Sequence, residues 1–216
     1  MRLGVEVTGC RRNGAGWLTD TATDTTFAAP HLVIATGMSH TPFLPDVPGM
    51  DLYDGRVLHS ADYDSGRDFQ DQDVLVVGFG NSAGEIALDL AEQGARPSIS
   101  VRSPSVVVPR DIVGIPILTV SRWLSVLPPR VADRLSAPLL WLMVGNIEKV
   151  GIPAARSGPL EQIATSGKIP LLDVGTMAAL KAGAIVARPG IGHFTPTGVE
   201  CSDGTSSDFD AVVFGS

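Results

Sequence analysis

One segment of the chain combines an apolar run, a glycine turn and an amphipathic stretch, and this order strongly limits the fold. Asp73–Val77 leads into Gly78-Phe79-Gly80-Asn81-Ser82-Ala83, and apolar residues then recur with helical spacing as far as Gln93. A strand followed at once by Gly-x-Gly-x-x-Ala and a helix indicates a dinucleotide-binding unit. We expect this helix to end at Gly94 and a second strand to follow at 97–102.

Each small residue of the turn has a separate role in that interpretation. Gly78 permits the tight turn, and Gly80 lets a pyrophosphate approach the backbone. Ala83 is small enough for the helix to pack on the strand, and the N–H groups from Asn81 onward would face the phosphates. Ser82 could donate to a phosphate or simply cap the helix. The alternative is an ordinary glycine-rich turn without a ligand.

The end of the second strand bears on which dinucleotide is bound. NAD sites usually place an acidic residue about 20 residues beyond the glycines, where it binds the ribose 2′-hydroxyl. This chain has Arg102-Ser103 there and no acidic neighbour. A guanidinium can bind a 2′-phosphate through paired hydrogen bonds, whereas a carboxylate would repel it. The pattern therefore favours NADPH, and the alternative is that Arg102 is a solvated charge at a strand end.

Composition excludes several classes of function. The chain has 216 residues, 44% hydrophobic and 18% charged, which is a globular composition. Its net charge is −7 with scattered basic residues, so we expect no nucleic-acid partner. Cys10 and Cys201 lie far apart, which indicates neither a metal site nor a disulfide framework and fits a cytoplasmic protein.

The most hydrophobic region, 117–144, is interrupted by arginines, an aspartate and prolines. Its longest uncharged piece, 135–147, is shorter than the roughly 18 residues that a membrane-spanning helix needs, so we expect no transmembrane segment. Core packing is the expectation for Trp123 and Trp141. The alternatives are a substrate passage and peripheral contact with a membrane surface.

The rest of the chain predicts an α/β fold assembled from separate parts. Residues 1–40 are expected to form short strands, 41–70 an extended connector, 71–190 the nucleotide-binding domain and 191–216 a return segment. The early strands are predicted at Gly4–Thr8, Gly14–Asp20 and His31–Gly37. A mostly helical insertion is predicted over about 104–165, and a last strand from Phe209. Strands without covering helices at both ends suggest a fragment of a larger protein.

Several motifs in the same order resemble those of flavin-containing monooxygenases, most closely the YUCCA-type enzymes that act on indole-3-pyruvate. The segment Tyr53–Tyr63 is similar to the family fingerprint Phe-x-Gly-x-x-x-His-x-x-x-aromatic, with Tyr in place of Phe. Ala35-Thr36-Gly37 matches a segment at the passage from the flavin domain to the NADPH domain. Three further similar segments are Val108–Arg110, Gly158–Glu161 and Gly167–Thr176.

The resemblance implies a three-layer, Rossmann-like FAD/NAD(P)-binding fold with the NADPH domain inserted in a partial FAD domain. Residues 1–40 and 191–216 would belong to the FAD domain. The family's N-terminal Gly-x-Gly-x-x-Gly for FAD is absent, and Phe214-Gly215-Ser216 departs from its second Ala-Thr-Gly. We therefore expect the activity to belong to an intact parent and this chain mainly to bind NADPH.

The activity implied is a monooxygenase reaction that uses NADPH and FAD. NADPH reduces the flavin, O₂ forms a hydroperoxyflavin, and one oxygen atom passes to a small organic substrate. Ala35, Thr36, Gly37, His59 and Ser60 join the cofactor-binding residues by this resemblance, and His59 would position rather than transfer protons. No catalytic residue is assigned. The alternatives are a Baeyer–Villiger enzyme, a flavin-linked reductase and a non-catalytic NADP(H)-binding module.

Overall fold

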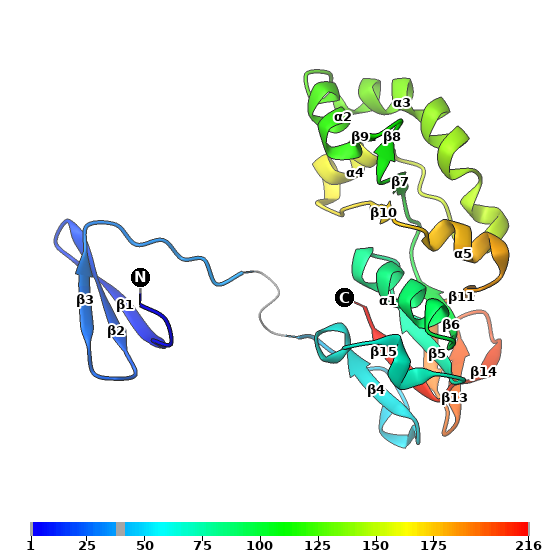
Figure 1. The fold of residues 1–216 in the computed structure, drawn as a ribbon, viewed down its shortest axis with the longest axis horizontal. Helices are drawn as coiled ribbons and strands as arrows, with labels where there is room; N and C mark the ends of the chain where they lie inside the picture. The colour runs from blue at the N-terminus through cyan, green and yellow to red at the C-terminus, as the bar shows by residue number, and fades with distance from the viewer. Residues whose placement is uncertain (1, 38–41, 216) are drawn as a thin grey trace. The chain divides into compact units, whose positions relative to one another are not determined.

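The computed structural model describes residues 2–37 and 42–215. The chain divides into two compact units, Met1–Thr41 and Pro42–Ser216 (Figure 1). The first unit is an antiparallel sheet in the order β1-β2-β3. Its strands are Val7–Asn13, Gly16–Thr21 and Thr26–Ala29.

The predicted strands of this first unit need two corrections. The first strand was expected at Gly4–Thr8 and instead runs over Val7–Asn13. The hairpin turn that follows is Gly14-Ala15, with Asn13 opposite Gly16. The predicted strand 31–37 is wrong, because no described strand pairs with it and Val33 is 83% exposed. An apolar run forms a strand only where another strand accepts its hydrogen bonds.

The second unit is built on a five-stranded parallel sheet in the order β11-β6-β5-β15-β4. Its first crossover is the expected one: β5 (Asp73–Val77), α1 (Asn81–Glu92) and β6 (Arg96–Val101). The helix ends where predicted, since Gly94 has the positive φ of 90° that favours glycine. The remaining strands are β4 (Arg56–His59), β11 (Val186–Pro189) and β15 (Ala211–Phe214).

Two strands come from segments that we expected to lie outside the nucleotide-binding domain. The strand β4 belongs to the expected connector 41–70, and β15 belongs to the expected return segment 191–216. Because β15 lies between β5 and β4, both segments fold with 71–190 in one compact unit. Whether they also belong to a flavin domain stays a prediction.

Alternate residues of β5 pack in two separate cores, which makes this unit three layers deep. Val74 and Val76 pack on the side of α1 and α5 (Thr176–Ala182). Leu75 packs on the opposite side, against a small antiparallel sheet. The strands of that sheet are β12 (Ile191–Phe194), β13 (Gly198–Cys201) and β14 (Ser206–Asp208). This ββα layering is the predicted fold class.

Between β6 and β11 the chain forms a helical subregion. Its helices are α2 (Ile117–Leu124), α3 (Pro129–Val144) and α4 (Pro159–Ser166). Short strands accompany them: β7 (Val107–Pro109), β8 (Asp111–Ile112), β9 (Ile115–Pro116) and β10 (Leu171–Asp173). Four 3₁₀ turns of the second unit are η1 (Met50–Leu52), η2 (Ser60–Asp62), η3 (Gly66–Phe69) and η4 (Ile147–Val150).

A buried carboxylate joins two of these helices. Asp133 on α3 accepts hydrogen bonds from the backbone N–H groups of Leu160 (3.0 Å) and Glu161 (2.9 Å) at the start of α4. A side chain at Gly158 would overlap the Asp133 carboxylate. Asp133 therefore caps α4, favourably placed at the positive end of the helix dipole. The segment Gly158–Glu161 thus has a structural role, since it holds the start of α4 against α3.

The expectation that Trp123 and Trp141 pack in a core is wrong. They are 62% and 68% exposed. On α3 the residues Ala132 and Val144 point inward, and Trp141 lies on another face of the same helix. No helix among the described residues has both the length and the apolar character to cross a membrane.

Candidate functional site

The glycine turn has the geometry that a phosphate-binding turn requires. Gly78 follows β5 with φ of 113°, a conformation that disfavours any side chain. Its N–H donates to the Ser100 carbonyl on the neighbouring strand at 3.0 Å. A Cβ atom placed on Gly80 would meet nothing within 4 Å. The backbone of Gly80 is therefore open to close approach by a ligand.

The third small position of the motif is constrained from two sides. Ala83 is fully buried at the start of α1. A Cβ placed on Gly215 would lie only 2.6 Å from the Ala83 Cβ. Gly215 itself is held by its N–H, which donates to the Val77 carbonyl at 2.9 Å. Close packing of β15, β5 and α1 thus requires a small residue at both 83 and 215.

The first turn of α1 is free of the groups that would repel an anion. Gly80 is its N-cap residue, and the turn contains no acidic residue. The suggestion that Ser82 caps the helix is wrong, because Ser82 is exposed within the first turn and not at the cap position. The Asn81 side chain accepts the Leu172 N–H at 2.7 Å, so it ties α1 to β10. The N–H groups at a helix N-terminus form a ready site for phosphate.

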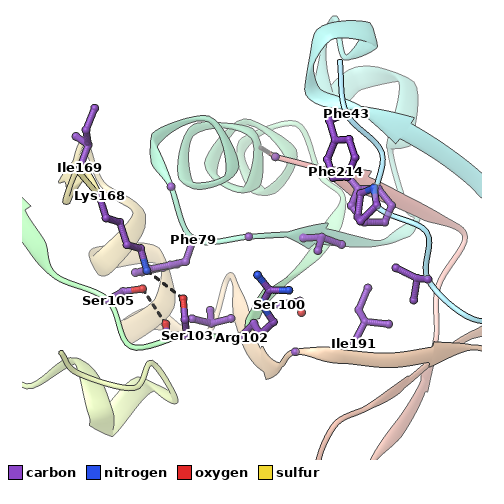
Figure 2. A pocket seen from close by; sticks show the side chains of 18 of the residues that line it. Phe43, Phe79, Ser100, Arg102, Ser103, Ser105, Lys168, Ile169, Ile191 and Phe214 are labelled. Atoms are coloured by element: carbon purple, nitrogen blue, oxygen red, sulfur yellow. Dashed lines mark hydrogen bonds between the residues drawn. The ribbon is translucent and has the colours of Figure 1, made fainter. Parts of the chain in front are cut away.

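A basic cluster lies at the end of β6. Arg102 and Ser103 line the same cavity as Gly78 and Gly80. Lys168 reaches it from the segment after α4: its ammonium donates to the Ser103 hydroxyl at 3.0 Å (Figure 2). The same ammonium donates to the Pro104 carbonyl at 3.1 Å. Sequence reasoning missed Lys168, although the segment containing it was noted, because its position beside Ser103 exists only in the folded chain.

The cavity has a volume of about 580 Å³ and lies at the carboxyl ends of the parallel strands. Binding sites of open α/β sheets lie at this edge, and this volume is in the range of small-molecule and cofactor sites. Its apolar walls include Phe43 and Phe214, which appear on the side of the cavity away from Lys168 (Figure 2). Asp46 is the acidic residue in the lining. The cavity thus combines apolar walls, an open glycine turn and a cationic end.

His59 and Ser60, in the second unit, are not among the residues that line this cavity. Ala35, Thr36 and Gly37 belong to the first unit. His59, at the end of β4, is buried and its Nδ1 accepts the Ala61 N–H at 3.0 Å. Ser60 begins the following 3₁₀ turn. The structure therefore joins Gly78, Gly80, Arg102 and Ser103 in one cavity. A cofactor role for Ala35, Thr36, Gly37, His59 and Ser60 stays a prediction.

The two aromatic ends of the fingerprint segment act as anchors. The Tyr63 hydroxyl donates to the Asp89 carboxylate of α1 at 2.6 Å, and the Gly66 N–H donates to the same oxygen at 2.7 Å. Burial and the bond to Asp89 raise the pKa of Tyr63. The Tyr53 hydroxyl donates to the Phe209 carbonyl at 2.7 Å, and burial raises its pKa to about 12. Both tyrosines therefore stay protonated and hold the segment Tyr53–Tyr63 against the rest of the second unit.

Nothing in the described part of the chain groups three or more His, Cys, Asp or Glu side chains as a metal site would. The cavity instead has the features of a site that binds anions and planar rings.

The order of the motifs along the chain corresponds to a known family. A sequence model described as flavin-binding monooxygenase-like matches residues 19–216. The chain belongs to this family.

Relatives of this monooxygenase-like chain include plant enzymes. It is 40% identical over 195 residues to the indole-3-pyruvate monooxygenase YUCCA4 of Oryza sativa subsp. japonica, a match that covers 88% of the chain and 44% of the relative. The corresponding values for YUCCA1 of the same subspecies are 37% over 186 residues, 84% and 45%. The chain thus spans less than half the length of these relatives. The resemblance inferred from the motifs is confirmed.

Solved structures of similar fold include bacterial monooxygenases. The flavin-containing monooxygenase from Stenotrophomonas maltophilia has a TM-score of 0.65 at 20% identity, covering 99% of this chain and 50% of that one. Cyclohexanone monooxygenase from Rhodococcus sp. Phi1, bound to NADP⁺, has a TM-score of 0.67 at 19% identity, covering 100% and 52%. At these identities the likeness confirms the predicted fold class.

Proposed function

We propose that the cavity binds NADPH, with the pyrophosphate at the first turn of α1 and the 2′-phosphate between Arg102, Ser103 and Lys168. The observation that carries this proposal is the position of Lys168, whose ammonium lies on the Ser103 hydroxyl at the cationic end of the cavity. A guanidinium and an ammonium together bind a phosphate dianion far better than a ribose hydroxyl. An NADH site would instead have a carboxylate at the end of β6.

The remaining walls suit the other parts of the cofactor. Gly78 and Gly80 leave the backbone accessible to the pyrophosphate, and the open space at Gly80 supports this assignment. The apolar side chains of the cavity provide flat surfaces for planar rings. When bound, NADPH supplies a hydride, and the residues of this chain bind and orient it. We infer no proton transfer by any of them.

The wider proposal is that the chain is the NADPH-binding part of a flavin-dependent monooxygenase. Such an enzyme would use NADPH, FAD and O₂ to oxygenate a small organic substrate. Family membership supports this role, and relatives named as indole-3-pyruvate monooxygenases suggest an α-keto acid as the first substrate class to test. Ala35, Thr36, Gly37, His59 and Ser60 remain proposed flavin-side and linking residues. The unpaired cysteines fit a cytoplasmic location.

Direct binding measurements test the cofactor proposal. NADPH and NADH are titrated into the chain and followed by calorimetry, with 2′,5′-ADP and 5′-AMP as competing fragments. We expect NADPH to bind at least about tenfold more tightly than NADH, since charge-assisted hydrogen bonds to the 2′-phosphate are lost with NADH. Equal affinities would show that Arg102 is only a solvated charge. No binding of either would return the glycine turn to a structural role.

Activity measurements separate the wider proposal from its alternatives. The intact parent expected from the sequence is supplied with FAD, and its NADPH-dependent oxygen consumption is recorded with α-keto acids, ketones and soft amines. Lactone or ester products from ketones would favour a Baeyer–Villiger reaction, and oxygen-independent NADPH oxidation would favour a flavin-linked reductase. NADPH binding without turnover in the presence of FAD would favour a binding module.

A further inference from the structure

The helix α3 carries apolar side chains on two opposite faces. Its inner face, with Ala132 and Val144, packs against β7 and α4. A second stripe, which recurs with helical spacing, is exposed: Val131, Leu135, Leu139 and Leu142. A surface helix normally presents polar residues to water, because only the buried stripe gains from being apolar. The exposed stripe of α3 is therefore a candidate surface for binding an apolar partner.

The neighbouring segment extends this exposed apolar surface. Leu118 and Trp123 of α2 and Val126 of the connection to α3 are exposed. Figure 1 shows α2 and α3 together at the end of the unit opposite β4. We call the set the outer face, and its members are Leu118, Trp123, Val126, Val131, Leu135, Leu139 and Leu142.

Within the segment 117–144 the exposed charged side chains are of one sign. Over 117–144 the exposed charged side chains are Arg122, Arg130 and Arg134. The acidic residue in this stretch, Asp133, is buried, and its carboxylate accepts hydrogen bonds from two backbone N–H groups of α4. Arg130 forms an ion pair with Glu161, so Arg122 and Arg134 carry the uncompensated positive charge. This local excess of positive charge runs against the net charge of −7 of the whole chain.

We propose that the outer face docks on a lipid bilayer that carries anionic head groups. Helices that lie in the plane of a membrane combine Trp and Leu side chains, which enter the boundary of the acyl chains, with basic residues that meet the lipid phosphates. The arginine stems can extend along the apolar surface while the guanidinium stays at head-group level. At 8 and 16 residues, α2 and α3 are too short to cross a bilayer and suit an in-plane position.

The same charges argue against a second copy of this chain as the occupant. A symmetric contact through the outer face would place Arg122 and Arg134 of two copies on facing apolar surfaces. Burying like charges opposite each other is unfavourable, whereas lipid phosphates neutralise them. The proposal does not depend on NADPH binding, since the outer face is separate from the cavity residues.

Vesicle binding of the whole chain tests this proposal. The chain is sedimented with vesicles of phosphatidylcholine alone and of phosphatidylcholine with phosphatidylserine. We expect binding to the anionic vesicles at least about tenfold above the neutral ones at low salt, falling steeply as salt is raised, because each arginine near the surface contributes about fivefold. Trp123 lies on the outer face, so its emission should shift to the blue on binding.

Matched variants assign the binding to the outer face. Leu142→Ser should lower anionic-vesicle binding about tenfold, as expected for withholding one leucine side chain from the bilayer. Its control is Leu52→Ser, which alters a similarly exposed leucine (64% against 75%) outside the outer face. Arg134→Gln should lower binding about fivefold, with Arg67→Gln as its control. Circular dichroism checks that all four variants are folded.

Two results would overturn the proposal. One is binding of the wild-type chain to anionic vesicles that is no stronger than to neutral vesicles, or that the controls reduce as much as the outer-face variants. The other is a dimer of the wild-type chain in light scattering that Leu142→Ser converts to a monomer, which would make the outer face an interface between copies.

Discussion

The strand β5 and the helix α3 are both rich in apolar residues, yet the fold treats them differently. Val74, Leu75 and Val76 of β5 are fully buried, whereas Leu142 of α3 is 75% exposed. The difference lies in what covers each element. Helices cover one face of β5 and a small antiparallel sheet covers the other, while α3 is covered on its inner face by β7 and α4. Apolar character thus indicates a surface that gains from burial, and the covering layer decides whether burial occurs.

The largest expected effect is on stability at the two leucines. Leu75→Ala should lower the free energy of unfolding by about 2–5 kcal/mol, since it removes buried contacts and leaves a cavity. Leu142→Ala should change it by less than about 0.5 kcal/mol, as at other exposed sites. Urea unfolding followed by circular dichroism measures both. A comparable loss for Leu142→Ala would mean that the outer face is covered in solution, and the contrast between β5 and α3 would disappear.

The next largest effect concerns the affinity for NADPH of the cavity at the end of β5. Arg102→Ala and Lys168→Ala should each raise the Kd for NADPH about tenfold or more, because each removes a charged donor to the 2′-phosphate. The Kd for NADH should change by less than about twofold. Calorimetric titration measures both, with Arg67→Ala as a control outside the cavity. Equal losses for the two nucleotides would place the 2′-phosphate elsewhere.

A pH titration tests the two tyrosines, Tyr53 and Tyr63, that hold the fingerprint segment to the rest of the second unit. Burial raises the pKa of Tyr53 to about 12 and also raises that of Tyr63. A group whose pKa is higher in the folded state stabilises the fold fully below its unfolded value, here about 10. This contribution is lost as pH rises through about 12 for Tyr53.

Tyr53→Phe should therefore cost about 1 kcal/mol at neutral pH through its lost hydrogen bond. It should also weaken the fall in stability at alkaline pH. Urea unfolding between pH 8 and about 11 measures this. A variant with the alkaline slope of the wild type would show that Tyr53 is not the titrating anchor.

The smallest effect is expected at Gly190, which is pressed against the cationic end of the cavity. A Cβ atom there would lie 3.1 Å from the Arg102 Cβ and would displace it by a few tenths of an ångström. Gly190→Ala should reduce the preference for NADPH over NADH about two- to fivefold, because hydrogen bonds weaken quickly with misalignment. Gly9→Ala is the control, since a Cβ there meets nothing within 4 Å. An unchanged preference would show that Arg102 has room to adjust.

Local patterns predicted the part of the site that is continuous in sequence. The strand–turn–helix at 73–92 and the positions of Gly78, Gly80 and Arg102 followed from spacing and residue size alone. The same reasoning failed for 31–37, where an apolar run has no strand to pair with, and for Trp123 and Trp141, where helical spacing left burial undetermined. In each case the outcome depended on contact with another part of the chain, and the local pattern holds no information about that contact.

The sequence by itself determined the βαβ unit through short-range steric rules and the family through motif order, and the resemblance to that family implied the three-layer fold class. Only the tertiary structure placed β15 between β5 and β4, brought Lys168 onto Ser103 across 65 residues, and set Gly215 against Ala83. It also left the outer face of α2 and α3 exposed. The physical reason is the same in each case. Pairing and coverage depend on which distant segments meet, and no local pattern encodes that meeting.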